Sequence, residues 1–176
     1  MMTEVKDALR RSELFSGFSD EQLARVAALG QDLAFRRGEL VVQEGDLGER
    51  IFIVRGGMVE VQVSREGASG LAGAPLAQRI VTLGPGQAFG EMAILDRGPR
   101  SATVRCVEDD TRLYAMPGQA LVDLCKEDPS IGYLLMRNLA LDLSFKRRHR
   151  NLRLRSGWGR TCRGRTCRGG TCRGGT

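Results

Sequence analysis

Residues 89–104 read Phe89-Gly-Glu-Met-Ala-Ile-Leu-Asp-Arg-Gly-Pro-Arg-Ser-Ala-Thr-Val104, and the rest of the chain is organised around this stretch. Gly90 can adopt a positive φ and lets the backbone approach a ligand closely. The run 91–95 consists of good helix formers, so Gly90 stands where a short helix begins. Because a helix N-terminus presents free N–H groups to an anion, the stretch predicts a site for a small anionic ligand.

Glu91 and Arg100 bring opposite charges to this turn, which Gly98-Pro99 closes. Arg100 is followed by the small residues Ser101 and Ala102, whose backbone N–H groups can point at the same anion. A guanidinium binds phosphate through a planar fork, and a carboxylate accepts hydrogen bonds from a sugar hydroxyl. Two interpretations stay open: the side chains divide a ligand between them, or they form an ordinary salt bridge with each other.

The stretch resembles the phosphate-binding cassette of the cyclic nucleotide-binding domain family, whose pattern is approximately F-G-E-x-A-L, a variable turn, and P-R-[A/S/T]-A-[T/S]-V. The resemblance implies that Gly90 and Glu91 contact the ribose 2′-hydroxyl. It also implies that Arg100 binds the cyclic phosphate, helped by the backbone of Ser101 and Ala102. The ligand-binding residues expected in the cassette are Phe89, Gly90, Glu91, Met92, Ala93, Arg100, Ser101 and Ala102.

The resemblance also bears on the base of the nucleotide. In the family, Thr at the position of Ser101 tends to favour cGMP and a small residue tends to go with cAMP. Ser101 is small but keeps a hydroxyl, so it leaves the choice of base open and leans to cAMP as the ligand, with cGMP second. The strand expected at 79–83 belongs, in the family, to an apolar wall against the base. Val81 and Leu83 are its candidates here, and alternation alone does not say which of them faces inward.

Short strands separated by glycine turns fill the chain from about residue 32 to 116. Residues 58–63 alternate apolar and polar side chains, which predicts a half-buried strand. Such strands argue for a sandwich or barrel, and the resemblance implies an α+β fold with a jelly-roll-like antiparallel β-barrel between N-terminal and C-terminal helices. The small residues of 64–78 predict a surface loop. The other predicted strands are 33–36, 39–43, 50–55, 79–83, 103–107 and 111–116.

Helices are expected on both sides of the barrel. Ser19-Asp-Glu-Gln22 is a capping-box signature that opens the N-terminal one. A short helix over 119–125 and a leucine-rich helix over 131–145 follow the last strand, and the basic cluster 146–150 continues the second helix. The resemblance covers residues 10–145, which we assign to a cyclic nucleotide-binding domain. It implies that the last helix closes over the base, and that helix is also a candidate contact for a homodimer.

The charge is distributed unevenly along the chain. Of the 27 Lys and Arg residues, 11 lie from residue 146 onward, where Asp and Glu do not occur, which leaves 16 basic and 21 acidic residues in 1–145. The net charge is therefore −5 for residues 1–145 and +11 for 146–176. The tail repeats Thr-Cys-Arg-Gly with a period of five, and we expect this basic, low-complexity segment to be disordered.

The composition predicts a soluble globular chain, since 41% of its residues are hydrophobic. We expect no membrane span and no signal peptide, hence a cytoplasmic location. The leading hypothesis is a sensor or regulatory domain for cAMP, less favourably cGMP, that signals by movement of its C-terminal helix. The alternative is the sensory half of a truncated catabolite-activator-type transcription regulator, with no DNA-binding domain in this chain because the globular sequence stops near residue 155.

An enzyme and a binding fold without a ligand are less favoured. The ligand stretch contains neither His nor Cys, and no metal-ligand spacing occurs, so we expect no catalytic residue and no metal site. Loss of ligand binding by drift would usually remove Glu91 or Arg100, and both are present.

Overall fold

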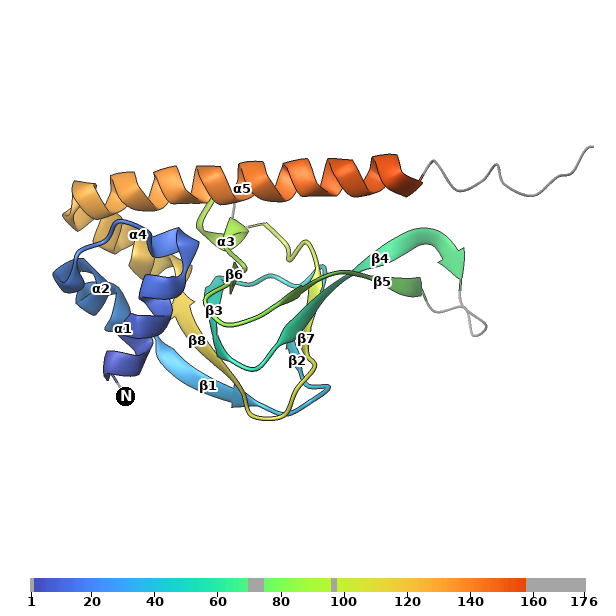
Figure 1. Cartoon of the computed structure of the whole chain (residues 1–176), viewed down its shortest axis with the longest axis horizontal. Helices are drawn as coiled ribbons and strands as arrows, with labels where there is room; N and C mark the ends of the chain where they lie inside the picture. The colour runs from blue at the N-terminus through green and yellow to red at the C-terminus, as the bar shows by residue number, and fades with distance from the viewer. Residues whose placement is uncertain (1, 70–74, 96–97, 158–176) are drawn as a thin grey trace, which may run out of the picture. The chain divides into compact units, whose positions relative to one another are not determined.

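Two four-stranded antiparallel sheets form the centre of the molecule in the computed structural model, which describes residues 2–69, 75–95 and 98–157 (Figure 1). For residues 2, 65–69, 75–77, 93–94 and 145–157 the description is limited to the backbone. One sheet has the order β1-β8-β3-β6, with β1 Gln31–Phe35, β8 Thr111–Pro117, β3 Arg50–Gly56 and β6 Ala88–Phe89. The other has the order β2-β7-β4-β5, with β2 Leu40–Val42, β7 Thr103–Cys106, β4 Val59–Ser69 and β5 Pro75–Leu83.

Every strand pair in these two sheets is antiparallel. Phe52 of β3, for example, is opposite Ala115 of β8 on one side and Phe89 of β6 on the other. With helices before and after the strands, the architecture confirms the predicted jelly-roll-like antiparallel barrel. The interior between the sheets is apolar, and its buried residues are Phe52, Val54, Val59, Leu83, Phe89, Val104, Cys106, Leu113 and Ala115.

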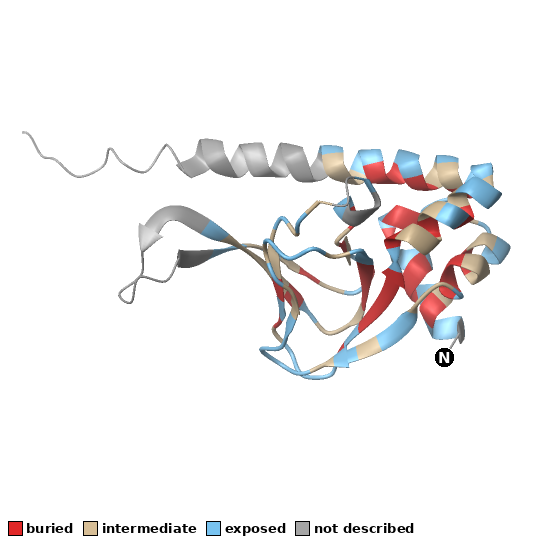
Figure 2. Ribbon diagram, turned by 180° about the vertical axis from the view of Figure 1, so that it is seen from behind, coloured by how far each residue is buried: buried red, intermediate tan, exposed pale blue. Residues whose placement is uncertain are grey.

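Strands β3 and β8 are buried on both faces, which explains why they read as nearly continuous apolar runs. Side chains alternate across a strand, so Phe52 and Val54 of β3 fill the barrel interior while Ile51 and Ile53, also fully buried, face the other way. Figure 2 shows that the red, buried segments gather where helices lie against these strands. The two strands therefore separate the barrel interior from a second, helical core.

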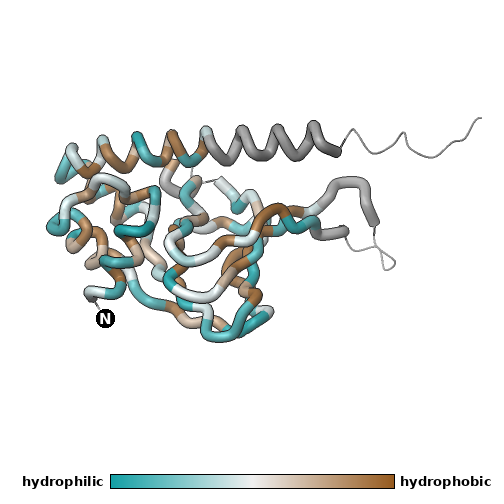
Figure 3. The backbone as a smooth tube through the Cα atoms, viewed as in Figure 1, coloured by the Kyte–Doolittle hydropathy of each residue, from teal (hydrophilic) through white to brown (hydrophobic). Residues whose placement is uncertain are grey.

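The helical core joins elements from both ends of the described chain: α1 (Met2–Arg11), the 3₁₀ helix η1 (Glu13–Phe15), α2 (Asp20–Ala27), α4 (Gly118–Glu127) and α5 (Pro129–Gly157). Figure 3 shows brown, apolar stretches along these helices. Fully buried side chains of this layer include Leu9, Phe15, Leu23, Val26, Leu121, Ile131, Leu135 and Leu139. A buried hydroxyl ties the layer to the barrel, since Tyr114 Oη accepts from Gly30 N (2.8 Å) and donates to Ala27 O (2.9 Å).

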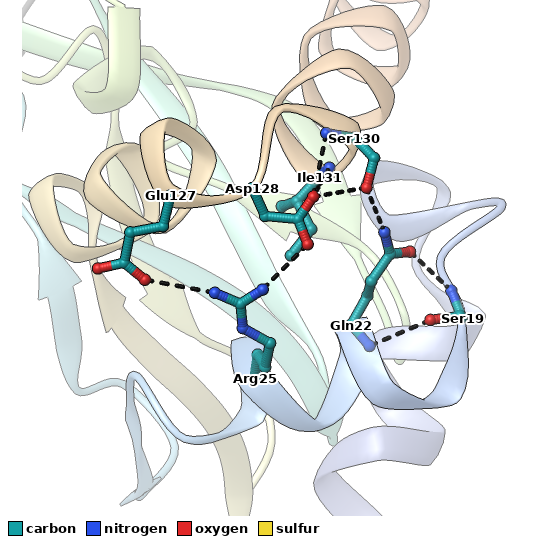
Figure 4. Close-up of polar contacts among 7 residues, drawn as sticks. All are labelled: Ser19, Gln22, Arg25, Glu127, Asp128, Ser130 and Ile131. Atoms are coloured by element: carbon teal, nitrogen blue, oxygen red, sulfur yellow. Dashed lines mark hydrogen bonds and ion pairs between the residues drawn. The ribbon is translucent and has the colours of Figure 1, made fainter.

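Hydrogen bonds and ion pairs between polar side chains connect α2 to the junction of α4 and α5 (Figure 4). The capping box predicted at Ser19 is confirmed, because Ser19 Oγ accepts from Gln22 N and Gln22 Oε1 accepts from Ser19 N. The same Gln22 side chain donates to Ser130 Oγ at 2.9 Å. Arg25 donates to Asp128 at 2.9 Å, and Asp128 in turn accepts from the backbone N–H of Ser130 at the start of α5.

The prediction of a surface loop over 64–78 is wrong for most of its length. Strand β4 continues to Ser69 and β5 begins at Pro75, and the pairs Ser64–Ala77 and Ser69–Pro75 extend the ladder as a two-stranded ribbon. Small residues have weak strand propensity. The ladder that Val59–Val63 forms with β5 nevertheless extends through them, because pairing satisfies their backbone N–H and C=O groups.

The last helix includes the basic run that begins at Lys146, as predicted, and extends beyond the predicted end at residue 150 to Gly157. The chain divides into two compact units, residues 1–142 and 143–176, so the barrel, the ligand stretch and the start of α5 belong to the first. Residues 158–176, which hold the three tail cysteines, lie outside the described residues.

Candidate functional site

The turn between β6 and α3 (Met92–Leu95) is built around Gly90. Gly90 has φ +77°, a left-handed conformation that side-chain-bearing residues rarely adopt. A Cβ at this position would lie 2.6 Å from Arg100 Nη1 and 2.9 Å from Arg50 O. Glycine is therefore required at position 90 for two reasons: the backbone conformation and the close approach of the Arg100 guanidinium.

Arg100 is held in a defined orientation. Its Nη2 donates to the carbonyl oxygen of Arg50 at 2.8 Å, and its Cζ lies over the ring of Phe52, 5.9 Å from the centroid, within the range of a cation–π contact. Burial lowers the pKa of Arg100, and the nearby charge of Glu91 opposes that shift. The guanidinium nevertheless stays protonated, because arginine does not lose its proton in proteins.

A second turn, residues 43–49 between β2 and β3, holds the backbone of Arg100 from both sides. Arg100 N donates to Asp46 O at 2.8 Å, and Gly45 N donates to Arg100 O at 2.9 Å. An isolated β-bridge pairs Leu47 with Pro99 next to these bonds. The turn 43–49 is thus joined to Pro99 and Arg100 by main-chain contacts, although more than fifty residues separate the paired positions in the sequence.

Two hollows flank the Arg100 side chain. One, of about 60 Å³, is lined by Gly48, Gly90, Glu91, Met92, Gly98, Pro99, Arg100 and Ser101. The other, of about 280 Å³, is lined by Val41, Val42, Gln43, Asp46, Leu47, Gly48, Glu49, Arg50, Phe52 and Arg100. Because Gly48 and Arg100 line both, the hollows adjoin at these two residues, and the larger hollow alone approaches the lower limit of small-molecule sites, about 300 Å³.

Glu91 belongs to this site as a buried carboxylate, with only 7% of the residue exposed. Its charge interacts electrostatically with Arg100, while the guanidinium itself is anchored on a backbone carbonyl. The two side chains are therefore neighbours at one hollow, as the sequence predicted.

The other predicted site residues are divided between the site and the core. Met92 and Ser101 line the smaller hollow, and the side chain of Ala93 lies outside the described residues. Phe89 is a core residue whose ring stacks on Phe52 at 5.0 Å with an interplanar angle of 11°. Three further residues line neither hollow: half-buried Ala102, buried Leu83 and partly exposed Val81.

Sequence reasoning missed Gly48, the carbonyl of Arg50 and the ring of Phe52. All three come from 48–52, which reads simply as the end of a turn and a buried strand. The signal available was Gly48 itself, a glycine only three residues after Gly45, which already supplies a positive φ to that turn. Pairing with residue 100 is a long-range contact that local sequence does not reveal.

The described residues also bear on two other features, a metal site and a membrane-spanning helix. Within residues 2–69, 75–95 and 98–157, three or more His, Cys, Asp or Glu side chains nowhere gather as a metal site would need. Among the helices of this described part, none combines the length and the apolar character needed to cross a membrane.

The fold and the site define an antiparallel barrel with a half-buried arginine and a buried glutamate beside a glycine turn. Comparison with known proteins identifies it: the sequence model of the Cyclic nucleotide-binding domain matches residues 32–128. The chain belongs to the cyclic nucleotide-binding domain family.

Relatives with names and structures agree with this assignment. The chain is 31% identical over 146 residues to the Cyclic AMP receptor protein of Thermus thermophilus, which covers 83% of this chain and 62% of that protein. The crystal structure of the Thermus thermophilus Catabolite Activator Protein superposes with a TM-score of 0.68 at 31% identity, covering 81% of this chain and 62% of the other. The chain therefore spans less than two thirds of these relatives.

A third relative is the regulatory domain of Toxoplasma gondii PKA, solved as a co-crystal with cAMP. It matches with a TM-score of 0.60 and 27% identity over 69% of this chain and 43% of that one. These relatives are named as receptor, activator and regulatory proteins rather than catalytic ones.

Proposed function

We propose that this chain is a cAMP-binding regulatory domain and not an enzyme, with cGMP as the less favoured ligand. The observation that carries the proposal is the Arg100 guanidinium, held at the junction of two hollows beside the buried carboxylate of Glu91. A cyclic nucleotide offers the matching chemistry, because it combines a phosphodiester anion with a free ribose hydroxyl.

Each part of the ligand has a proposed partner. Arg100 takes the cyclic phosphate through its remaining N–H groups, with the backbone N–H groups of Ser101 and Ala102 beside it. Glu91 and the backbone of Gly90 take the ribose 2′-hydroxyl. The small side chain of Ser101, which lines the smaller hollow, favours cAMP.

The base needs an apolar wall. Val81 and Leu83 are two residues apart on β5 and share a face of the strand. Leu83 is buried in the barrel core, whereas Val81 is 39% exposed. Val81 is therefore the better candidate for direct contact with the base, and Leu83 supports the strand from the core.

Signalling is proposed to pass through α5. Asn138 of this helix donates to the carbonyl oxygens of Leu14 and Ser16 near η1. The helix also carries exposed apolar side chains, those of Tyr133, Met136 and Leu141. Ligand binding would shift the helix between two positions, and the exposed apolar residues would serve a homodimer.

A second candidate function is the sensory part of a catabolite-activator-type transcription regulator in the cytoplasm. The similarity to the Thermus thermophilus receptor, which this chain matches over 62% of that protein's length, favours it. A gene sequence that continues into a DNA-binding domain would support this candidate over a stand-alone sensor.

The test is a calorimetric titration of the purified chain with cAMP and then with cGMP. Micromolar or tighter binding of cAMP with clearly weaker binding of cGMP is the expected result. If neither nucleotide binds, the protein is denatured and the released material is analysed for nucleotide. An empty protein that binds neither ligand would contradict the proposed function.

A further inference from the structure

We propose that Gly48 is a positioning residue for ligand binding, because the missing Cβ at this position creates the slot in which the Arg100 guanidinium lies. The inference rests on the proposed function, in which Arg100 binds the phosphate. Gly48 would act through Arg100 and needs no contact of its own with the ligand.

The slot is defined by distances. A Cβ on Gly48 would lie 2.3 Å from Nε, 2.7 Å from Nη2 and 2.8 Å from Cζ of Arg100, all shorter than real Cβ contacts. Gly90 forms another wall, since its Cβ would meet Nη1 of the same guanidinium at 2.6 Å. The flat guanidinium thus occupies the space that two missing side chains leave, with its Nη2 hydrogen-bonded to Arg50 O.

The backbone does not explain a glycine at position 48. Gly45 and Gly90 have positive φ values of 88° and 77°, whereas Gly48 is outside the left-handed region, so alanine can adopt its conformation. The three heavy atoms nearest to such a Cβ all belong to the Arg100 guanidinium, which is therefore the first obstacle to a side chain. Because that group is the end of a flexible side chain, a Cβ would displace it at little expense to folding and would empty the slot.

The slot and the arginine are held in register by main-chain bonds. Arg100 N donates to Asp46 O and Gly45 N donates to Arg100 O, so the turn that contains Gly48 also fixes the Arg100 backbone. The backbone of Arg100 is therefore fixed, and its guanidinium fits into the slot beside Gly48. Gly48 and Arg100 both line the two hollows, which puts this place where a ligand would arrive.

The test substitutes Gly48→Ala and compares it with Gly84→Ala and Gly56→Ala. Both controls lie outside the left-handed region, and a Cβ at either has no heavy atom within 4 Å. We expect Gly48→Ala to weaken cAMP binding in calorimetry at least tenfold, while its melting temperature matches those of the controls. Equal or tighter cAMP binding by Gly48→Ala, or an equal loss in the controls, would overturn the inference.

A double-mutant cycle separates action through Arg100 from a direct effect on the ligand. In an Arg100→Lys background there is no guanidinium to seat, so adding Gly48→Ala should reduce cAMP affinity less than twofold further. A full tenfold loss in that background would show that Gly48 acts independently of the arginine, against the inference.

A readout without ligand keeps the inference testable if wild-type protein fails to bind cAMP, which would refute the proposed function alone. The Nε–H of Arg100 should give a distinct signal in a ¹⁵N-correlation NMR spectrum, assigned by its loss in Arg100→Lys. Gly48→Ala should shift or remove this signal, and Gly84→Ala should leave it in place. An unchanged signal in Gly48→Ala would refute the slot.

Discussion

The two sides of strand β3 are stabilised by different kinds of interaction. Toward the ligand site, Phe52 lies beneath Arg100, and the surrounding turns are joined by main-chain hydrogen bonds and by the space that glycines leave. Toward the helices, Ile51 and Ile53 are fully buried in an apolar layer. The difference predicts that the proposed ligand binding depends mainly on Arg100 and its turns, and that stability depends mainly on the helical layer, with Phe52 contributing to both the site and the core.

The largest effect should come from the arginine at the ligand side. Arg100→Leu removes the cation proposed for the phosphate and should weaken cAMP binding by about 2–5 kcal/mol, roughly 30-fold to several thousand-fold. Calorimetry measures the loss, and circular dichroism should show an unchanged fold. Arg105→Leu, at an exposed arginine on β7, is the matched control and should bind normally. Unchanged cAMP affinity in Arg100→Leu would contradict the prediction that binding depends on this arginine.

On the helix side, the effect should appear in stability instead. Leu135→Ala empties a fully buried position of α5 and should lower the free energy of unfolding by about 2–5 kcal/mol. Denaturant titration measures this change. Leu141→Ala, on the same helix but 58% exposed, should change stability by less than about 0.5 kcal/mol. Equal effects of the two variants would mean that the helical core does not contribute as described.

Removing the hydroxyl of Tyr114 tests the contact between the barrel and the helical layer. Tyr114→Phe keeps the ring but leaves Gly30 N and Ala27 O without their side-chain partner. Because a buried polar group without a partner costs about 1–3 kcal/mol, thermal unfolding should show a stability loss within that range and no change in cAMP affinity. Tyr133→Phe, at a 70% exposed tyrosine, should show neither effect.

The smallest effect concerns acid stability at the α4–α5 junction. The hydrogen bond from the Ser130 side chain, above all, holds the pKa of Asp128 below its ordinary 3.8. A depressed folded-state pKa contributes stability above the unfolded pKa, and that contribution is lost as the pH falls through the folded value. Asp128→Asn should therefore lower stability at neutral pH and flatten its decline below about pH 4, relative to Glu108→Gln. Parallel acid-unfolding curves would argue against this role.

Local patterns predicted the parts of the molecule that neighbouring residues determine. Ser19 and Gln22 form a capping box within four residues, and Gly90 takes its left-handed conformation next to a short helix, so both could be predicted from the chain itself. Glu91 and Arg100 were placed together by their spacing around one turn and by the resemblance to a known cassette.

Contacts between distant segments were not predictable in the same way. The loop predicted over 64–78 failed because the pairing of Ser64 with Ala77 depends on a partner strand rather than on the propensity of small residues. The role of Gly48 was missed because nothing next to it in the sequence indicates the guanidinium of residue 100. The position of Phe89 in the core, stacked on Phe52, likewise follows only from strand pairing.

The bond between Arg100 and the carbonyl of Arg50 has a consequence for the entropy of binding. A mobile arginine side chain carries about 2 kcal/mol of rotamer freedom, which is lost when a ligand immobilises it. Here the loss is incurred during folding, so binding should carry a smaller entropic penalty. A barrel with the same charges but a mobile arginine would make the same contacts with the anion and bind it more weakly.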